Sequence, residues 1–186
     1  LGTKRNLRTR LIKDLLGDYH LDGQGDPDFG IYHLNKILEA IEKDQLVQTL
    51  FSRSKSVKLY IYEEPYKTWW PSGWHYSDKL ESYGAPITRL GLNANSSATS
   101  ITNPLSTTID TLKGLNTNGK INLTIIRRKQ SELRSSILDK KLLELNSAKI
   151  PALLSLANSE SHNFTAEVLL RNSIRNWDVE PNIYEV

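Results

Sequence analysis

The chain has 186 residues, of which 38% are hydrophobic and 24% are charged, and its formal net charge is +3. This composition is typical of a globular protein, and the mild positive charge is compatible with an anionic partner without requiring one. Cysteine is absent, which excludes disulfides and thiolate metal sites. No apolar run approaches the roughly 18 residues that span a bilayer, so the sequence predicts no transmembrane segment. We expect a soluble protein, with an intracellular location favoured over secretion.

The first regular pattern covers 3–16 and predicts an amphipathic helix. Its apolar residues recur at helical spacing at Leu7, Leu11, Ile12, Leu15 and Leu16. Basic residues, among them Arg8, occupy many of the other positions. A basic helix face is either solvated or contacts phosphates or acidic lipids, so Arg8 is a candidate nucleic-acid contact and peripheral membrane contact is an alternative.

An acidic loop follows, and a second helix is expected at 30–43, which would complete an N-terminal helical pair over 3–45. The acidic residues of the loop are Asp18, Asp22, Asp26 and Asp28. Hard cations such as calcium prefer carboxylate and carbonyl oxygens around a sharp glycine turn. The loop is therefore a candidate calcium site.

The acidic loop resembles an EF-hand or dockerin loop, and the matching residues are Asp18, Asp22, Gly23 and Asp26. This resemblance implies a calcium cofactor. The sequence departs from the pattern because His20 stands where an oxygen ligand is expected and Phe29 stands where a bidentate acid is expected. The alternative is an acidic turn that caps the second helix through Asp26 or Asp28.

A strand is expected at 57–62, where apolar and polar residues alternate, and it leads into an aromatic stretch that extends to residue 83. Pro65 and Pro71 interrupt regular structure there, so several aromatic rings are expected to leave a loop. The central residues of this stretch are Lys67, Trp69, Trp70 and Trp74. Their rings either fold back as a lid over the sheet, form a platform that stacks on a base or sugar, or form a subunit interface.

The middle of the chain alternates between expected strands and a long polar segment. Pro86–Leu92 is a candidate second strand, and the uncharged polar residues of 93–110 predict an exposed loop. A further strand is expected at 121–128, where apolar residues alternate with others. It ends in a basic cluster of three residues, Arg127, Arg128 and Lys129. These charges are either solvated or contact an anionic partner.

Helices are expected in the C-terminal part. One runs from 131 to about 145, a short one covers 152–157, and a last one starts where Thr165 caps it and Phe164 packs against the next turn. Trp177 is expected to attach the end of the chain to the core, before an acidic tail at 178–186.

The order of these elements predicts an α+β fold in a single domain over 1–186. We expect a small, mostly antiparallel sheet packed with amphipathic helices, and a mixed strand and helix body at 56–177.

No motif of a familiar enzyme class is complete. The four histidines have no zinc-binding spacing, no serine lies in a G-x-S-x-G elbow, and no glycine-rich phosphate loop is present. Glu63 and Glu64 follow a strand and adjoin aromatic residues, as the carboxylates of glycosidases can. A hydrolase that uses them is one alternative, but an adjacent acidic pair is commoner at a solvated strand end.

The sequence favours a non-catalytic binding or scaffold component of a larger assembly over an enzyme. Basic residues near exposed aromatic rings are the features with which proteins follow a phosphate backbone and stack on bases. The favoured partner is an anionic polymer, either nucleic acid or nucleoprotein. The candidate contacts are Trp69, Trp70, Trp74, Lys67, Arg127, Arg128, Lys129 and Arg8. The alternative from another class is an extracellular carbohydrate-binding module that uses the three tryptophans as sugar platforms.

Residues 119–150, GKINLTIIRRKQSELRSSILDKKLLELNSAKI, are similar to the strand and helix near the C-terminal end of rhabdovirus matrix proteins. This resemblance implies a non-enzymatic viral structural protein that meets both nucleocapsid and membrane. The 186 residues contain no proline-rich late-domain motif. A matrix-like assembly protein, with protein partners and peripheral membrane contact, is therefore a further alternative.

Overall fold

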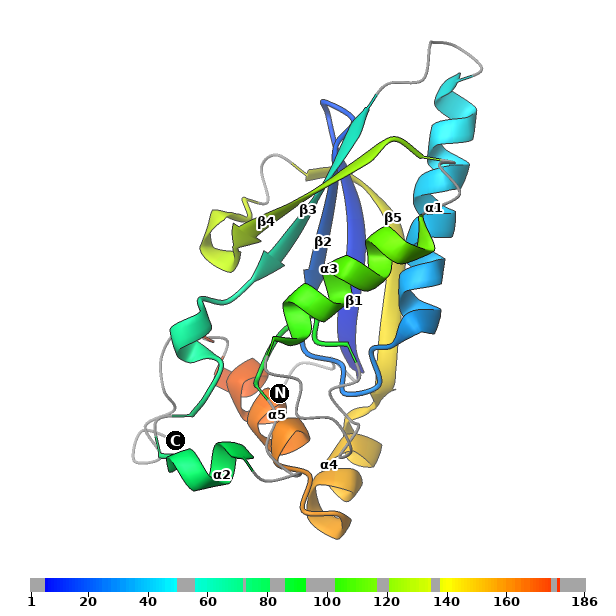
Figure 1. Ribbon diagram of the computed structural model, residues 1–186. Helices are drawn as coiled ribbons and strands as arrows, with labels where there is room; N and C mark the ends of the chain where they lie inside the picture. Colours follow the sequence, from blue (N-terminus) through cyan, green and yellow to red (C-terminus); the bar gives the residue numbers. More distant parts are fainter. Residues whose placement is uncertain are drawn as a thin grey trace.

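The computed structural model describes residues 6–49, 56–71, 73–80, 86–92, 103–116, 121–134, 138–174 and 177. A five-stranded sheet with the strand order β4-β3-β2-β1-β5 forms its centre (Figure 1). The strands are β1 (Asn6–Asp14), β2 (Tyr19–Gly23), β3 (Val57–Glu63), β4 (Leu123–Lys129) and β5 (Leu138–Lys149). The helices are α1 (Ile31–Thr49), α2 (Tyr76–Leu80), α3 (Pro104–Leu115), α4 (Ile150–Ser159) and α5 (Asn163–Ile174), with the 3₁₀ turns η1 (Tyr66–Thr68) and η2 (Gln130–Glu132).

Helices α1 and α3 lie against one face of this sheet, and α4 and α5 pack together at one end of it (Figure 1). Successive residues of β3 point alternately to the two faces of the sheet. Val57, Leu59 and Ile61 are buried in the main core with residues of α1 and α3. The intervening residues of β3 therefore point to the opposite face. A second hydrophobic cluster joins α4 and α5 and includes Phe164 and Trp177.

The N-terminal segment is a strand, so the helix expected at 3–16 is wrong. Leu7, Thr9 and Leu11 are buried in alternation along β1, which is the period of a strand. Leu15 and Leu16, which complete the helical pattern in the sequence, are 80% and 81% exposed in the turn after β1. Strand β1 is paired on both sides, with β2 and β5, and these backbone hydrogen bonds override a local helical pattern.

The helix expected from 131 to 145 is also wrong, because Leu138–Lys149 forms β5. This strand pairs antiparallel with β1 and has several register shifts, which disturb the two-residue period that would have identified it. Its residues Leu142, Leu143 and Leu145 are partly buried against the main core. The same finding removes the strand-and-helix pattern on which the comparison with matrix proteins depends.

The sheet is mixed, so the expectation of a mostly antiparallel sheet is wrong, while the α+β class is confirmed. Strand β1 pairs antiparallel with β2 and β5, whereas β3 pairs parallel with β2 and β4. The parallel pairs arise because α1 crosses between β2 and β3 and α3 lies between β3 and β4 in the chain. In the described portion, no helix combines the length and apolar character needed to cross a membrane.

Two expectations for the middle of the chain are corrected. Residues 86–92 pair with no strand and form a bent segment beside the end of β3. Residues 104–110, expected as part of a polar loop, belong to α3, whose start is capped by Asn103 through the backbone N–H of Ser106. The preceding residues 93–102 lie outside the described part of the chain.

The remaining helices and strands agree with those predicted from the sequence. Strands β3 and β4 and helices α1, α4 and α5 are confirmed, although His162 rather than Thr165 accepts the hydrogen bond at the start of α5. Trp177 is buried as expected and packs over Gly25, whose φ of +77° and close approach to the indole ring require glycine. The expected acidic tail at 178–186 lies outside the described residues.

Candidate functional site

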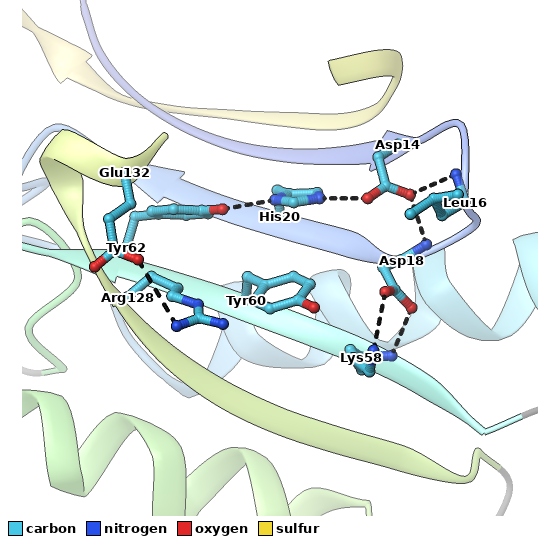
Figure 2. Close-up of a pocket in the computed structure, with 9 residues that line it drawn as sticks. All are labelled: Asp14, Leu16, Asp18, His20, Lys58, Tyr60, Tyr62, Arg128 and Glu132. Carbon is cyan, nitrogen blue, oxygen red and sulfur yellow. Dashed lines mark hydrogen bonds and ion pairs between the residues drawn. The ribbon is translucent and has the colours of Figure 1, made fainter. Parts of the chain in front are cut away.

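A pocket of about 410 Å³ opens on the sheet face opposite α1 and α3. Figure 2 shows the residues that line it, which come from β1 to β4, from the turn between β1 and β2 and from η2. They are Asp14, Leu16, Asp18, His20, Lys58, Tyr60, Tyr62, Arg128 and Glu132. The pocket thus gathers titratable and aromatic side chains from segments that are far apart in the sequence.

A chain of hydrogen bonds crosses the pocket from Asp14 to His20 to Tyr62 (Figure 2). Oδ2 of Asp14 lies 3.0 Å from Nε2 of His20, and Nδ1 of His20 lies 2.9 Å from the hydroxyl oxygen of Tyr62. The His20 and Tyr62 residues are 2% and 3% exposed. Three adjacent strands therefore hold three functional groups in a fixed order.

The Asp14 carboxylate is itself held in place. Its Oδ1 accepts hydrogen bonds of 2.9 Å from the backbone N–H groups of Leu16 and Asp18, which leaves Oδ2 to face His20. Burial alone would raise the pKa of Asp14, but the hydrogen bonds from His20 and from the backbone hold it below its ordinary value. In a neutral His20 whose Nε2 proton is donated to an ionised Asp14, Nδ1 is the acceptor for the hydroxyl of Tyr62.

Tyr62 lies beside a positive charge. It is paired in register with Arg128 of β4, and the charge of Arg128 favours a tyrosinate. Burial is the larger influence and raises the pKa of Tyr62 above its ordinary value. The hydroxyl therefore holds its proton more firmly than that of a free tyrosine, and the base within hydrogen-bond distance of it is His20.

Tyr60 has no free ring face. The ring of His20 stacks on it with a centroid distance of 5.1 Å, and the guanidinium of Arg128 lies 5.6 Å from its centroid. His20 and Arg128 belong to the strands on either side of β3, so they cover opposite faces of Tyr60. The pocket consequently offers polar groups and ring edges to a ligand, and not an aromatic stacking platform.

The rim of the pocket carries both signs of charge. Lys58 lies 3.8 Å from Asp18, and Arg128 lies 3.7 Å from Glu132. The side chains of Lys58 and Arg128 are 52% and 46% exposed. Exposed ion pairs of this length contribute little to stability, so the two cations can exchange these partners for an anionic ligand at small cost.

The tryptophans expected to form a contact surface separate into two groups. Trp69 is 1% exposed, and its indole N–H donates a 3.0 Å hydrogen bond to the backbone oxygen of Glu64, so this ring belongs to the core. Trp70 and Trp74 are partly exposed and lie 5.8 Å apart in a tilted arrangement. Lys67 is exposed in η1. Only part of the expected platform is therefore accessible.

The expected basic contacts are also separated. Arg127, Arg128 and Lys129 are exposed at the end of β4, which is an edge strand of the sheet. Arg8 lies on β1 and not on a helix face, and its guanidinium is 3.9 Å from Glu144 of β5. Arg128 is the one expected contact that also lines the described pocket.

Asp18, Asp22 and Asp26 of the expected calcium loop each contact a different group. Asp18 lies against Lys58, and Asp22 forms an ion pair with β1. Asp26 accepts a 3.0 Å hydrogen bond from the N–H of Asp28 and forms the turn before α1. Because strands flank the first part of this loop, the helix-loop-helix outline is wrong. Among the residues that the structure describes, no group of three or more histidine, cysteine, aspartate or glutamate side chains could hold a metal ion.

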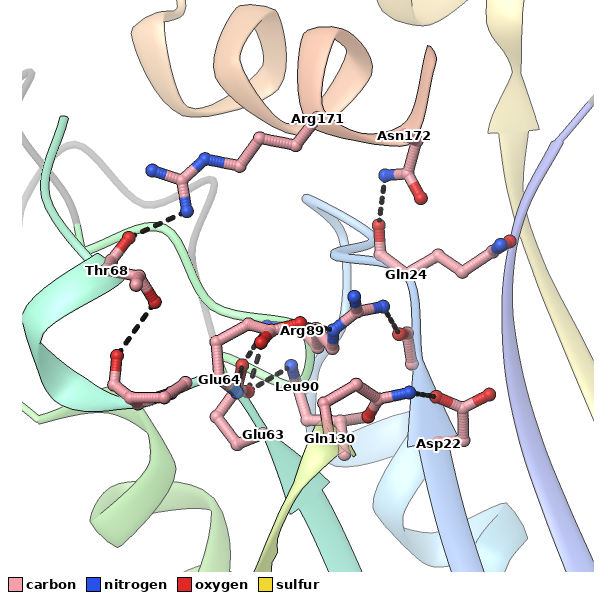
Figure 3. A network of polar contacts seen from close by, with 12 residues as sticks. Asp22, Gln24, Glu63, Glu64, Thr68, Arg89, Leu90, Gln130, Arg171 and Asn172 are labelled. Carbon is pink, nitrogen blue, oxygen red and sulfur yellow. Dashed lines mark hydrogen bonds and ion pairs between the residues drawn. The ribbon is translucent and has the colours of Figure 1, made fainter. Parts of the chain in front are cut away.

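The carboxylates of Glu63 and Glu64 bind other groups of the same chain (Figure 3). The Glu63 carboxylate accepts hydrogen bonds from the backbone N–H groups of Glu64, Arg89 and Leu90, at 2.8–3.0 Å. Glu64 is paired with the side chain of Arg89, and both glutamates are at most 5% exposed. This arrangement joins β3 to the segment 86–92, and it gives no support to a hydrolase that presents these carboxylates to a substrate.

We expect the buried Glu63 to make the protein less stable as the pH rises. Burial raises its pKa from 4.5 to about 7, although the three N–H donors favour the ionised carboxylate. The folded state thus holds the proton more tightly than the unfolded state, so this stabilisation is complete below about 4.5 and is lost as the pH passes about 7. Its size is at most about 3 kcal/mol.

Urea unfolding from about pH 5 to about pH 8 measures this effect, with Glu63→Gln as the variant that cannot titrate. The free energy of unfolding of the wild type should fall with rising pH relative to that of the variant. Parallel pH profiles for the two proteins would show that Glu63 has the same pKa in the folded and unfolded states.

Comparison with known proteins assigns the chain to no family. No protein-family model matches the chain, and no curated protein sequence is significantly similar to it. The site is therefore interpreted from its own geometry.

Sequence reasoning missed Asp14, His20 and Tyr62 as a group. Asp14 lies within the segment 3–16, which the sequence predicts as a helix, and His20 enters the predictions as a departure from a calcium loop and as one of four histidines without zinc-binding spacing. A weak signal exists in Tyr19–Gly23 and in β3, where polar or aromatic residues alternate with apolar ones and thereby share one sheet face. The pairing of β2 with β3, which brings the group together, leaves no local mark in the sequence.

Proposed function

We propose that this chain binds an anionic polymer, with single-stranded nucleic acid as the favoured class, along the end of β4 and the pocket beside it. The observation that carries the proposal is the position of Arg128, which belongs to the basic cluster and also lines the pocket. A polymer held by the cluster would therefore place a phosphate at the rim of the pocket.

The edge position of β4 supports this proposal. Because alternate residues of a strand face opposite sides, Arg127 and Arg128 point to different faces of the same sheet edge. All three residues of the cluster are exposed, so a flexible chain of phosphates that passes the edge could contact each of them. A single-stranded polymer suits this geometry better than a rigid duplex, because it can bend around the edge.

The test is removal of the cluster. The triple variant Arg127→Gln, Arg128→Gln and Lys129→Gln is expected to bind a fluorescein-labelled single-stranded oligonucleotide about tenfold or more weakly, as measured by fluorescence anisotropy. Each lost phosphate contact on a single strand reduces the slope of log affinity against log salt by about 0.7, so the triple variant should reduce it by about 2.

The matched control removes the same charge from the opposite edge of the sheet. Lys140, Lys141 and Lys149 are exposed on β5, and their replacement by glutamine should change the affinity far less. Equal losses in the two triple variants would indicate a general charge effect and contradict a site on β4. Undetectable oligonucleotide binding by the wild type at low salt would reject the proposal.

A second candidate is carbohydrate binding by the pair Trp70 and Trp74, which is favoured by their partial exposure and their 5.8 Å separation. Sugar stacking responds little to salt, whereas phosphate contacts weaken steeply as salt rises. Binding of glycans that is insensitive to salt and is lost in Trp74→Ala would support this candidate in place of the first.

A further inference from the structure

We propose that Tyr62 is a base-activated nucleophile toward a phosphodiester, with His20 as the base and Asp14 as the residue that positions His20. This inference rests on the proposed function, because the basic cluster would deliver the phosphate to the pocket. It adds an activity to a chain for which sequence motifs favoured binding alone.

The geometry has the three roles that activated nucleophiles require. The hydroxyl of Tyr62 lies 2.9 Å from Nδ1 of His20, within the range for direct proton transfer. Asp14 lies 3.0 Å from the other ring nitrogen and is itself fixed by two backbone N–H groups. A nucleophile, a base and a group that orients the base are thus held in line by β3, β2 and β1.

The surroundings favour charge on the tyrosine oxygen during the reaction. Arg128 is the register partner of Tyr62 and lines the same pocket, so its guanidinium can contact both the phosphate and the developing tyrosinate. The pocket volume of about 410 Å³ is within the range of sites that hold small ligands.

The reaction needs no co-reactant other than water. The oxygen of Tyr62 attacks phosphorus while its proton moves to Nδ1 of His20. The bond from phosphorus to the leaving oxygen breaks, and that oxygen takes the proton back from Nδ1. The products are an alcohol and a phosphotyrosyl protein, and water activated by the same nitrogen then hydrolyses the phosphotyrosyl bond and restores Tyr62.

The experiment uses the full chain with bis(p-nitrophenyl) phosphate, a phosphodiester with a good leaving group. Wild-type protein should release p-nitrophenolate, which is followed by absorbance. Mass spectrometry of the intact protein and of its peptides should show an aryl phosphate on Tyr62. Tyr62→Phe, which keeps the ring, should abolish the adduct and lower the rate at least about 100-fold.

Asp14→Asn tests the orientation of His20 without removing its ring. The amide would donate to Nε2 and shift the proton of His20 to Nδ1, so the base would be lost although the hydrogen-bonded frame remains. We expect at least about a 100-fold lower rate with a wild-type unfolding midpoint, a combination that a purely structural role would not produce. Tyr32→Phe is the matched control, because Tyr32 is 65% exposed on α1 and does not line the pocket, and its rate should be that of the wild type.

The outcomes separate this inference from the proposed function. Oligonucleotide binding by a wild-type protein that forms no adduct and releases no p-nitrophenolate would overturn the inference and leave the binding proposal in place. Turnover that depends on Tyr62 in a protein that binds no oligonucleotide would support the inference and overturn the binding proposal. Turnover that persists in Tyr62→Phe would assign the activity to another group and overturn the inference.

Discussion

Replacement of Arg89 by alanine is expected to lower the free energy of unfolding by about 3–5 kcal/mol. The Arg89 side chain is paired with Glu64, whose side chain is 3% exposed, and its guanidinium lies 4.3 Å from the ring centroid of Trp177. Its Nη1 also donates to the backbone oxygen of Gly23. The substitution therefore removes the opposite charge from a buried carboxylate and the contact of the guanidinium with Trp177.

Urea unfolding followed by far-UV circular dichroism measures this loss. The matched control is Lys113→Ala, which breaks the exposed pair of Lys113 with Asp110 and should cost less than about 1 kcal/mol. Arg89→Lys keeps the charge but loses the forked donor and should fall between the two. An Arg89→Ala variant as stable as Lys113→Ala would show that the network around Glu64 does not stabilise the fold.

Replacement of Trp69 by alanine is expected to cost about 3–5 kcal/mol, which is the usual effect of truncating a buried tryptophan. The ring is 1% exposed, lies 5.1 Å from the ring of Tyr66, and loses its hydrogen bond to Glu64 in the variant. The same measurement on Trp74→Ala should give less than about 1 kcal/mol, because Trp74 is partly exposed.

This pair of variants distinguishes the two interpretations of the aromatic stretch. A core role for Trp69 predicts a large loss of stability, whereas a ligand platform predicts lost binding with unchanged stability. If Trp69→Ala unfolds at the urea concentration of the wild type, the placement of this ring in the core is wrong.

Only part of the candidate site was accessible to sequence reasoning. Arg128 was identified from the basic cluster at the end of an expected strand, because charge and alternation are local features. The sequence left open whether Trp69 folds back over the sheet or forms a platform, since composition does not show which ring of an aromatic stretch folds inward. His20 and Tyr62 are 42 residues apart, and their 2.9 Å contact depends on the parallel pairing of β2 with β3.

The elements whose pattern is local are predicted correctly from the sequence. The alternation of β3 and β4 and the apolar faces of α1, α4 and α5 appear within short windows, and the structure confirms them. That 6–14 and 138–149 are strands depends on the tertiary structure, because these two segments pair with each other although they lie near opposite ends of the chain. Strand order and register place the functional groups beside one another. Helices α1 and α3 are both buried against one face of the sheet, and Asp14, His20 and Tyr62 line the pocket on the other face.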